Sequence, residues 1–181
     1  MLPLLLVFGC MKKNTTPLAK TEDFVLPEAP NISFPTEGET TALEVVDLDG
    51  DGKTDVWRYN VEVDDSIYQR GMDLNKDGRE DVRSYFGSGN DLIREEIDAD
   101  FDGKVDINDK YENGERISSE VDTNSDGTYD LFYFFERNTL VRKEQDTDYN
   151  GSLDLCNELD PYGNVVANCA KSPLDSLEET Q

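Results

Sequence analysis

The chain has 181 residues, of which 41 are acidic and 17 basic, giving a formal net charge of −24, and it contains no histidine. The charge excludes a nucleic-acid binder, because a phosphate backbone would be repelled by this protein. The absence of histidine removes the usual general base, the Ser–His and Cys–His nucleophile pairs, and the commonest zinc ligand.

Residues 1–10, MLPLLLVFGC, form an apolar stretch that ends in a small residue followed by a cysteine. The stretch is too short to span a bilayer, which needs about 20 apolar residues. It resembles the end of a bacterial lipoprotein signal peptide, in which Val7-Phe8-Gly9-Cys10 fills the lipobox. The resemblance implies that Cys10 is lipidated and anchors the protein to a membrane of the bacterial cell envelope. An incidental N-terminal cysteine is the alternative.

The segments that flank the central part of the chain are polar and have no regular hydrophobic period. Residues 11–41 contain four prolines and many Thr and Glu residues, and residues 171–181 are similarly polar. Segments of this kind rarely form a packed core. We therefore expect a disordered tether over 11–41, a repeat domain over 42–170 and a disordered tail over 171–181.

The central domain repeats one acidic nine-residue segment five times. Each copy fits the pattern D-x-[DN]-x-[DN]-G-x-x-D, and successive copies start 26, 25, 24 and 24 residues apart. The copies are DLDGDGKTD (47–55), DLNKDGRED (73–81), DADFDGKVD (98–106), DTNSDGTYD (122–130) and DTDYNGSLD (146–154). A fixed period of this length is typical of a repeat protein in which each repeat is one supersecondary unit.

Each acidic segment is followed by an apolar residue, a strand-like run, a turn cluster and a second strand-like run. The runs are rich in β-branched and aromatic residues, which favours strands over helices. Strand, short turn and strand is the pattern of a β-hairpin. The sequence therefore predicts an all-β antiparallel meander of about ten short strands, built from five hairpin repeats, with the acidic loops along one edge. The pattern leaves open whether the sheet closes on itself.

The acidic loops have the residue types that calcium prefers. Calcium takes six to eight oxygen ligands from carboxylates and backbone carbonyls, and a glycine at loop position 6 permits the sharp turn that would bring them together. Positions 1, 3, 5 and 9 would contribute side chains, and position 7 its carbonyl. The expected ligand residues are Asp47, Asp49, Asp51, Lys53, Asp55, Asp73, Asn75, Asp77, Arg79, Asp81, Asp98, Asp100, Asp102, Lys104, Asp106, Asp122, Asn124, Asp126, Thr128, Asp130, Asp146, Asp148, Asn150, Ser152 and Asp154.

The loops differ from EF-hands, which carry a bidentate Glu at position 12 and continue into a helix. Here a strand-like run follows, and position 12 is Arg58, Ser84, Asp109, Tyr133 or Asn157. The loops are more similar to the DxDxDGxxD calcium loops of thrombospondin type 3 repeats and integrin alpha chains. This resemblance implies up to five Ca²⁺ ions with a structural role. We expect the all-Asp loops, 47–55 and 98–106, to bind best, and the loop 73–81, which carries Lys76 and Arg79, to be the least favourable site.

The two remaining cysteines indicate the redox state of the compartment. If Cys10 is lipidated, Cys156 and Cys169 are left as a pair that forms a disulfide in an oxidising compartment; two free thiols are the alternative. Together these features predict a calcium-binding, lipid-anchored, non-enzymatic module for structure or adhesion, with a protein or glycan partner. A carboxylate-dependent enzyme acting on glycans or phosphates, or a simple calcium buffer, would be the alternative functions.

Overall fold

The computed structural model describes residues 41–61 and 66–169, and within these ranges the fold is all-β. Cys10, the expected signal peptide, residues 11–40 of the expected tether and residues 171–181 of the expected tail lie outside the described residues, whereas Thr41 begins the first strand. The strands are β1 (Thr41–Val46), β2 (Val56–Val61), β3 (Ser66–Met72), β4 (Val82–Phe86), β5 (Leu92–Ile97), β6 (Ile107–Glu112), β7 (Glu115–Val121), β8 (Leu131–Glu136), β9 (Thr139–Gln145), β10 (Leu155–Leu159) and β11 (Val165–Asn168).

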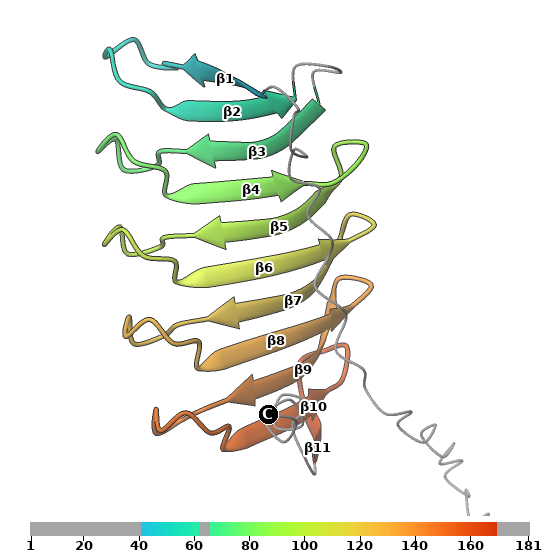
Figure 1. Cartoon of the computed structure of the whole chain (residues 1–181). Coiled ribbons are helices and arrows are strands. Elements are labelled where there is room, and N and C mark those ends of the chain that lie inside the picture. The colour runs from blue at the N-terminus through green and yellow to red at the C-terminus, as the bar shows by residue number, and fades with distance from the viewer. Residues whose placement is uncertain (1–40, 62–65, 170–181) are drawn as a thin grey trace, which may run out of the picture.

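The eleven strands form one sheet whose spatial order is the sequence order, and every neighbouring pair is antiparallel. This confirms the predicted meander. The five acidic segments connect strands along one edge, the left in Figure 1, and the shorter turns connect them along the other. Eleven strands form rather than about ten because residues 41–46, which precede the first acidic loop, also pair with β2.

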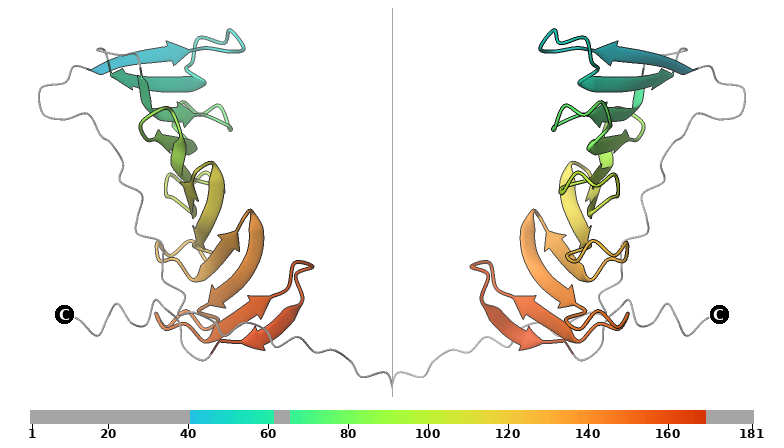
Figure 2. Two further views of the ribbon diagram at one scale, coloured as in Figure 1. Left: turned by 90° about the vertical axis from the view of Figure 1, so that its right-hand side faces the viewer. Right: turned by 90° about the vertical axis from the view of Figure 1, so that its left-hand side faces the viewer.

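The sheet is open and one layer thick. Among the described elements only strands adjacent in the sheet make contact with one another, and β1 and β11 lie at opposite ends (Figure 1). Figure 2 shows the sheet edge-on as a strongly twisted single layer, as expected from the right-handed twist of β-strands. In the part of the chain that the structure describes, no helix has the length and apolar character needed to cross a membrane.

The register gives the sheet a narrow apolar row instead of a full core. One row crosses the sheet next to the acidic loops and is apolar except at Gln145. It consists of Val46, Val56, Met72, Val82, Ile97, Ile107, Val121, Leu131, Gln145 and Leu155. Of the described hydrophobic residues only Leu131 (9 % exposed) and Phe134 (3 % exposed) are buried. Phe134 thus belongs to the small core of the sheet.

The two faces of the sheet differ, because successive side chains of a strand point to opposite faces. The face that carries the apolar row also carries Asp109, Ser119 and Tyr133, and we call it the groove face. The opposite face, which we call the ion-pair face, carries charged ladders. There Glu96 pairs with Arg94 and accepts a hydrogen bond from the Tyr85 hydroxyl at 2.8 Å.

Buried charges on the ion-pair face are paired. Arg142 (8 % exposed) contacts the fully buried Glu144 at 2.5 Å, and Glu120 accepts hydrogen bonds from Asn108 and Lys110. A buried charge is costly unless it is paired and hydrogen-bonded. Polar ladders therefore take the place that apolar packing occupies in a two-layer fold.

A disulfide joins Cys156 of β10 to Cys169, the residue after β11, with a Cα–Cα distance of 5.1 Å. The Cys169 amide also donates to the Cys156 carbonyl at 3.0 Å. Both residues lie at the edge of the sheet that carries the acidic loops, because β11 runs toward that edge as the other odd-numbered strands do. The disulfide therefore joins the end of β11 to β10 at the loop edge of the sheet.

Candidate metal centres

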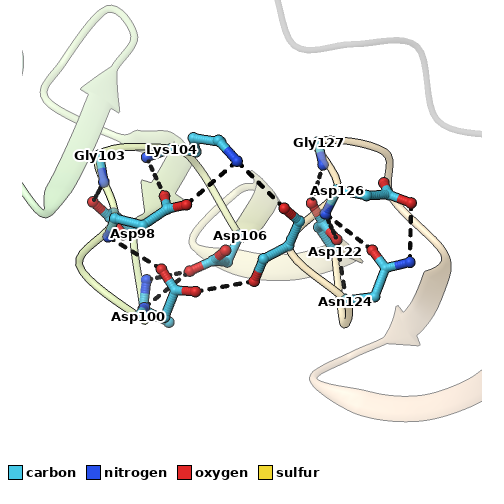
Figure 3. A network of polar contacts seen from close by, with 12 residues as sticks. Asp98, Asp100, Gly103, Lys104, Asp106, Asp122, Asn124, Asp126 and Gly127 are labelled. Atoms are coloured by element: carbon cyan, nitrogen blue, oxygen red, sulfur yellow. Dashed lines mark hydrogen bonds and ion pairs between the residues drawn. The ribbon is translucent and has the colours of Figure 1, made fainter.

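Each acidic loop is organised by the same hydrogen bonds between its own carboxylates and backbone amides. In the loop 98–106, one oxygen of Asp98 accepts from the Gly103 amide at 2.8 Å, and Asp106 accepts from the amides of residues 99 and 100 at 2.6 and 3.0 Å (Figure 3). Equivalent bonds from the position-6 glycine to the position-1 Asp occur in all five loops, at 2.7 to 2.9 Å. The acidic residues therefore fix the path of the chain and turn carboxylate oxygens toward one point.

Two positions of each loop adopt left-handed backbone conformations. The position-6 glycines have φ between 88° and 92°, as predicted from the sharp turn. Position 4 is also left-handed, although only the first loop has glycine there; the residues are Gly50, Lys76, Phe101, Ser125 and Tyr149, with φ between 58° and 79°. Such a conformation is uncommon for a residue with a side chain, so the hydrogen-bond network of the loop imposes it.

Four of the five loops bring three carboxylates together, with one oxygen from each within 4.8 Å of the others. The groups are Asp47, Asp49 and Asp55; Asp73, Asp77 and Asp81; Asp98, Asp100 and Asp106; and Asp146, Asp148 and Asp154. At that separation each pair of charges repels by roughly 1 kcal/mol in water and by about 3 kcal/mol at an effective dielectric constant of 20. These four clusters could each hold a metal ion, since a divalent cation would offset the repulsion.

The loop 122–130 differs from the others. Its position 3 is Asn124, whose amide Nδ2 donates to Asp126 Oδ2 at 2.9 Å, and its acids form no cluster of three within the distance that the other loops meet. The sequence suggested that 73–81 would be the weakest site because of Lys76 and Arg79. In the structure Lys76 instead contacts Asp49 of the preceding loop, and Asp73, Asp77 and Asp81 converge.

The predicted ligand positions are not equivalent in the structure. Positions 1 and 9 belong to all four clusters, and position 3 to three of them. Position 5 joins a cluster only in the loop 73–81, although in all five loops its side chain accepts from the amide of position 7 at 2.8 to 2.9 Å. A position-7 residue thus orients the position-5 side chain through its amide.

Neighbouring loops contact one another along the edge of the sheet. Lys53 Nζ donates to the carbonyl of Lys76 at 2.7 Å, while the Lys76 ammonium pairs with Asp49. Two loops further on, Lys104 Nζ donates to the carbonyl of Ser125 at 3.3 Å, and Ser125 Oγ donates to Asp100 at 2.9 Å (Figure 3). Position 7 of one loop therefore holds position 4 of the next in both pairs.

Hydrogen bonds lower the pKa of several loop carboxyls. Lys76 holds the pKa of Asp49 below its ordinary value, Asn124 does the same for Asp126, and the Thr147 hydroxyl does so for Asp154. A group that stabilises the charged form of a carboxylate lowers its pKa. These three side chains are fully ionised at neutral pH and can act as anionic ligands.

Sequence reasoning missed the contacts made by positions 2 and 4. At position 2, Thr123 and Thr147 donate their hydroxyls to the position-9 Asp at 2.6 and 2.8 Å. At position 4 the residue types are too different from one another to show a motif. Their equivalent place in the repeat is the one feature of the sequence that relates them, because equivalent positions of neighbouring loops lie side by side along the edge of the sheet.

Comparison with known proteins adds little to this picture. No family model and no curated protein matches the chain. Among solved structures, the chain resembles one described as "Crystal Structure of TarM", with 13 % identity and a TM-score of 0.27 over 70 % of this chain. The chain spans about a fifth of that protein, 21 % of its length. At these values the likeness supports no statement on function.

Proposed function

We propose that the acidic loops bind calcium and that the ions stabilise the loop edge of the sheet. The single observation that carries the proposal is the convergence of three carboxylates in four of the five acidic loops. The donors are all oxygen atoms, which suit a hard cation, and they combine buried and exposed aspartates of irregular loops. Calcium accepts such irregular sites, whereas magnesium demands near-ideal octahedral geometry and keeps its waters.

The number and strength of the sites follow from the loop sequences. Four clusters contain three carboxylates each. The remaining loop, 122–130, has the carboxylates of Asp122, Asp126 and Asp130 and the amide oxygen of Asn124. Four strong sites and a weaker fifth at 122–130 are therefore expected. Calcium modules outside the cytoplasm typically bind in the 10⁻⁴–10⁻³ M range, so these sites would be occupied constantly where calcium is abundant.

The wider role that we propose is a lipid-anchored, non-enzymatic module of the bacterial cell envelope. The lipobox-like segment ending at Cys10 supports the anchor, and a Cys156–Cys169 disulfide is consistent with an oxidising compartment. A long, thin sheet held at one end offers a large surface for its size, which suits adhesion or scaffolding. Incorporation of a labelled fatty acid by the full chain, abolished by Cys10→Ser, would test the anchor.

A calorimetric titration of the full chain with calcium chloride tests the metal sites. We expect four or five ions per chain, and clearly weaker binding of magnesium. The double substitution Asp98→Asn with Asp100→Asn should remove one ion, because it takes two of the three carboxylates from one cluster. Asp160→Asn, in a turn at the opposite edge, is the matched control and should leave the stoichiometry unchanged. Absence of saturable calcium binding by the unmodified chain would refute the proposal.

A further inference from the structure

A groove on the groove face of the sheet combines apolar walls with a pair of opposite charges. It has a volume of about 450 Å³ and crosses β5 to β9, and its end at Ile97, Ile107 and Val121 adjoins the acidic loops. Ile97, Ile107, Val121, Tyr133, Phe135 and Leu140 supply its apolar and aromatic lining. Pockets of this size ordinarily hold small molecules or parts of larger ones.

Asp109 is the unusual residue of this groove. It is 4 % exposed, and its Oδ1 atom has no hydrogen-bond partner among the described residues. Its other oxygen, Oδ2, accepts from the Arg116 guanidinium at 3.0 Å and from the Tyr111 hydroxyl at 3.4 Å. Because a buried acceptor left unsatisfied is unfavourable, the site would be stabilised by one further hydrogen-bond donor.

Arg116 is the charged partner of Asp109 in the groove. Its side chain is 42 % exposed and lies over the Phe135 ring, 4.4 Å from the ring centroid. Because it is bound to the rest of the sheet mainly through Asp109 and Phe135, it can move without disturbing the strands. A displaced guanidinium would still offer donors to a ligand, while Asp109 would offer acceptors.

The chemistry of the groove selects the class of ligand. The aromatic and aliphatic walls require an apolar face on the ligand, and Asp109 requires a donor. An anionic ligand is disfavoured by the net charge of −24. A cationic group would compete with Arg116 for the same carboxylate and would meet its positive charge. A neutral sugar ring satisfies both demands, since one face presents C–H groups and its rim presents hydroxyls.

We infer that this groove binds a neutral sugar ring of a glycan, with Tyr133 and Phe135 against the ring and Asp109 accepting from a hydroxyl. Arg116 donates to an oxygen of the same ligand. This site is lined by residues of the strands and not of the acidic loops, and the inference does not rest on calcium binding. It gives the protein a second kind of surface, on the face of the sheet instead of its edge.

An array of immobilised neutral glycans probed with the full chain, followed by calorimetry with the strongest binder, tests the inference. Tyr133→Ala and Asp109→Asn should each weaken binding by about tenfold or more, the loss expected for a hydrogen bond to a charged group or a large buried contact. Phe132→Ala is the matched control, because Phe132 is the preceding residue of β8 and points to the ion-pair face. It should leave the affinity unchanged.

Folding and metal effects are separated by further measurements. Each variant is melted alongside the unmodified chain, and Arg116→Gln, at a more exposed position, replaces Asp109→Asn if that variant fails to fold. Titrations in calcium and in chelator distinguish the groove from the loops. No binding to any neutral glycan, preferential binding of cationic peptides or acidic glycans, or equal affinity of the Tyr133 and Phe132 variants would overturn the inference.

Discussion

Both edges of the sheet carry connections that reverse the chain between antiparallel strands, but the two kinds of connection differ. Along the loop edge, five nine-residue connections that share one acidic motif join strand pairs that remain in regular register. Along the turn edge the connections differ in sequence, and every hairpin carries a register shift close to its turn. The described turns of the turn edge reverse the chain through backbone conformation and local hydrogen bonds, whereas every connection of the loop edge gathers several acidic side chains.

The turn edge uses residues that adopt left-handed conformations locally. In the β6–β7 turn Asn113 has φ 51° and Gly114 φ 79°, and in the β8–β9 turn Arg137 and Asn138 have φ 49° and 59°. Two successive residues with positive φ are typical of the type I′ turn, whose twist matches that of the flanking strands. Bulges beside these turns increase the twist further. These hairpins need no ion, and the comparison predicts that the two edges respond differently to calcium.

The largest expected effect is the loss of stability when calcium is removed. At a free calcium concentration tenfold above the dissociation constant, each site contributes about 1.4 kcal/mol, so four sites contribute roughly 6 kcal/mol. This is a large fraction of the stability of an ordinary domain. Thermal melts followed by far-ultraviolet circular dichroism in calcium and in chelator measure it, with magnesium as the control. Identical melting temperatures in both conditions would show that the loop edge, like the turn edge, does not depend on calcium for its stability.

A smaller effect comes from replacing one glycine at each edge with alanine. Gly103 (φ 92°) and Gly114 (φ 79°) both have left-handed conformations, so alanine should cost about 1–2 kcal/mol at either. At Gly103 the change should also disturb the carboxylate cluster of Asp98, Asp100 and Asp106. Urea denaturation should therefore show a calcium-dependent penalty for Gly103→Ala and a constant one for Gly114→Ala. Equal dependence on calcium would remove the distinction between the edges.

The smallest effect concerns pH at the turn edge. Hydrogen bonds from Asn164 hold the pKa of Asp160 below its ordinary value, and the Asn164 and Tyr162 amides donate to the same carboxylate at 2.9 Å. A carboxyl whose pKa is lower in the folded state stabilises the fold above its unfolded pKa, and this contribution is lost as pH falls through the folded pKa.

Asp160→Asn should therefore lower the melting temperature slightly at pH 5 and have less effect near pH 2, values that lie on either side of the ordinary aspartate pKa of about 3.9. The melts are recorded in chelator, so that the pH dependence of calcium binding by the loops does not mask the effect of the substitution. A penalty that stays constant from pH 5 to pH 2 would show that the hydrogen bonds to Asp160 do not depend on its charge.

Much of the fold follows from the repeat. A period of about 25 residues with alternating strand-like runs and turns leaves few arrangements other than a meander, and the position-6 glycines indicate where the chain turns. The period could not decide between an open and a closed sheet, because closure depends on whether β1 and β11 pair, which neighbouring repeats do not determine. The expected number of strands was also based on two strands after each acidic loop, and β1 is not included in that number because it precedes the first loop.

The candidate sites were predictable to different degrees. The loop motif identified every carboxylate of the four clusters, because each ligand lies within nine residues of the others. Contacts between loops, such as Lys76 with Asp49, depend on residues from different repeats and on side-chain conformation. In the sequence Asp109 stands out only at position 12 of its loop, where an EF-hand would carry a glutamate. Its place opposite Ser119 in the groove arises from strand register, which the loop motif does not specify.

The linear order of the strands has a mechanical consequence. Because β1 and β11 lie at opposite ends of the sheet, a force that pulls them apart acts across the strands and along the backbone hydrogen bonds (Figure 1). Such bonds open one strand pair at a time instead of resisting together, as they would if the strands were sheared lengthwise. Each opened repeat would release about 25 residues of chain, so the module would extend in steps and absorb work while its remaining hairpins stay folded.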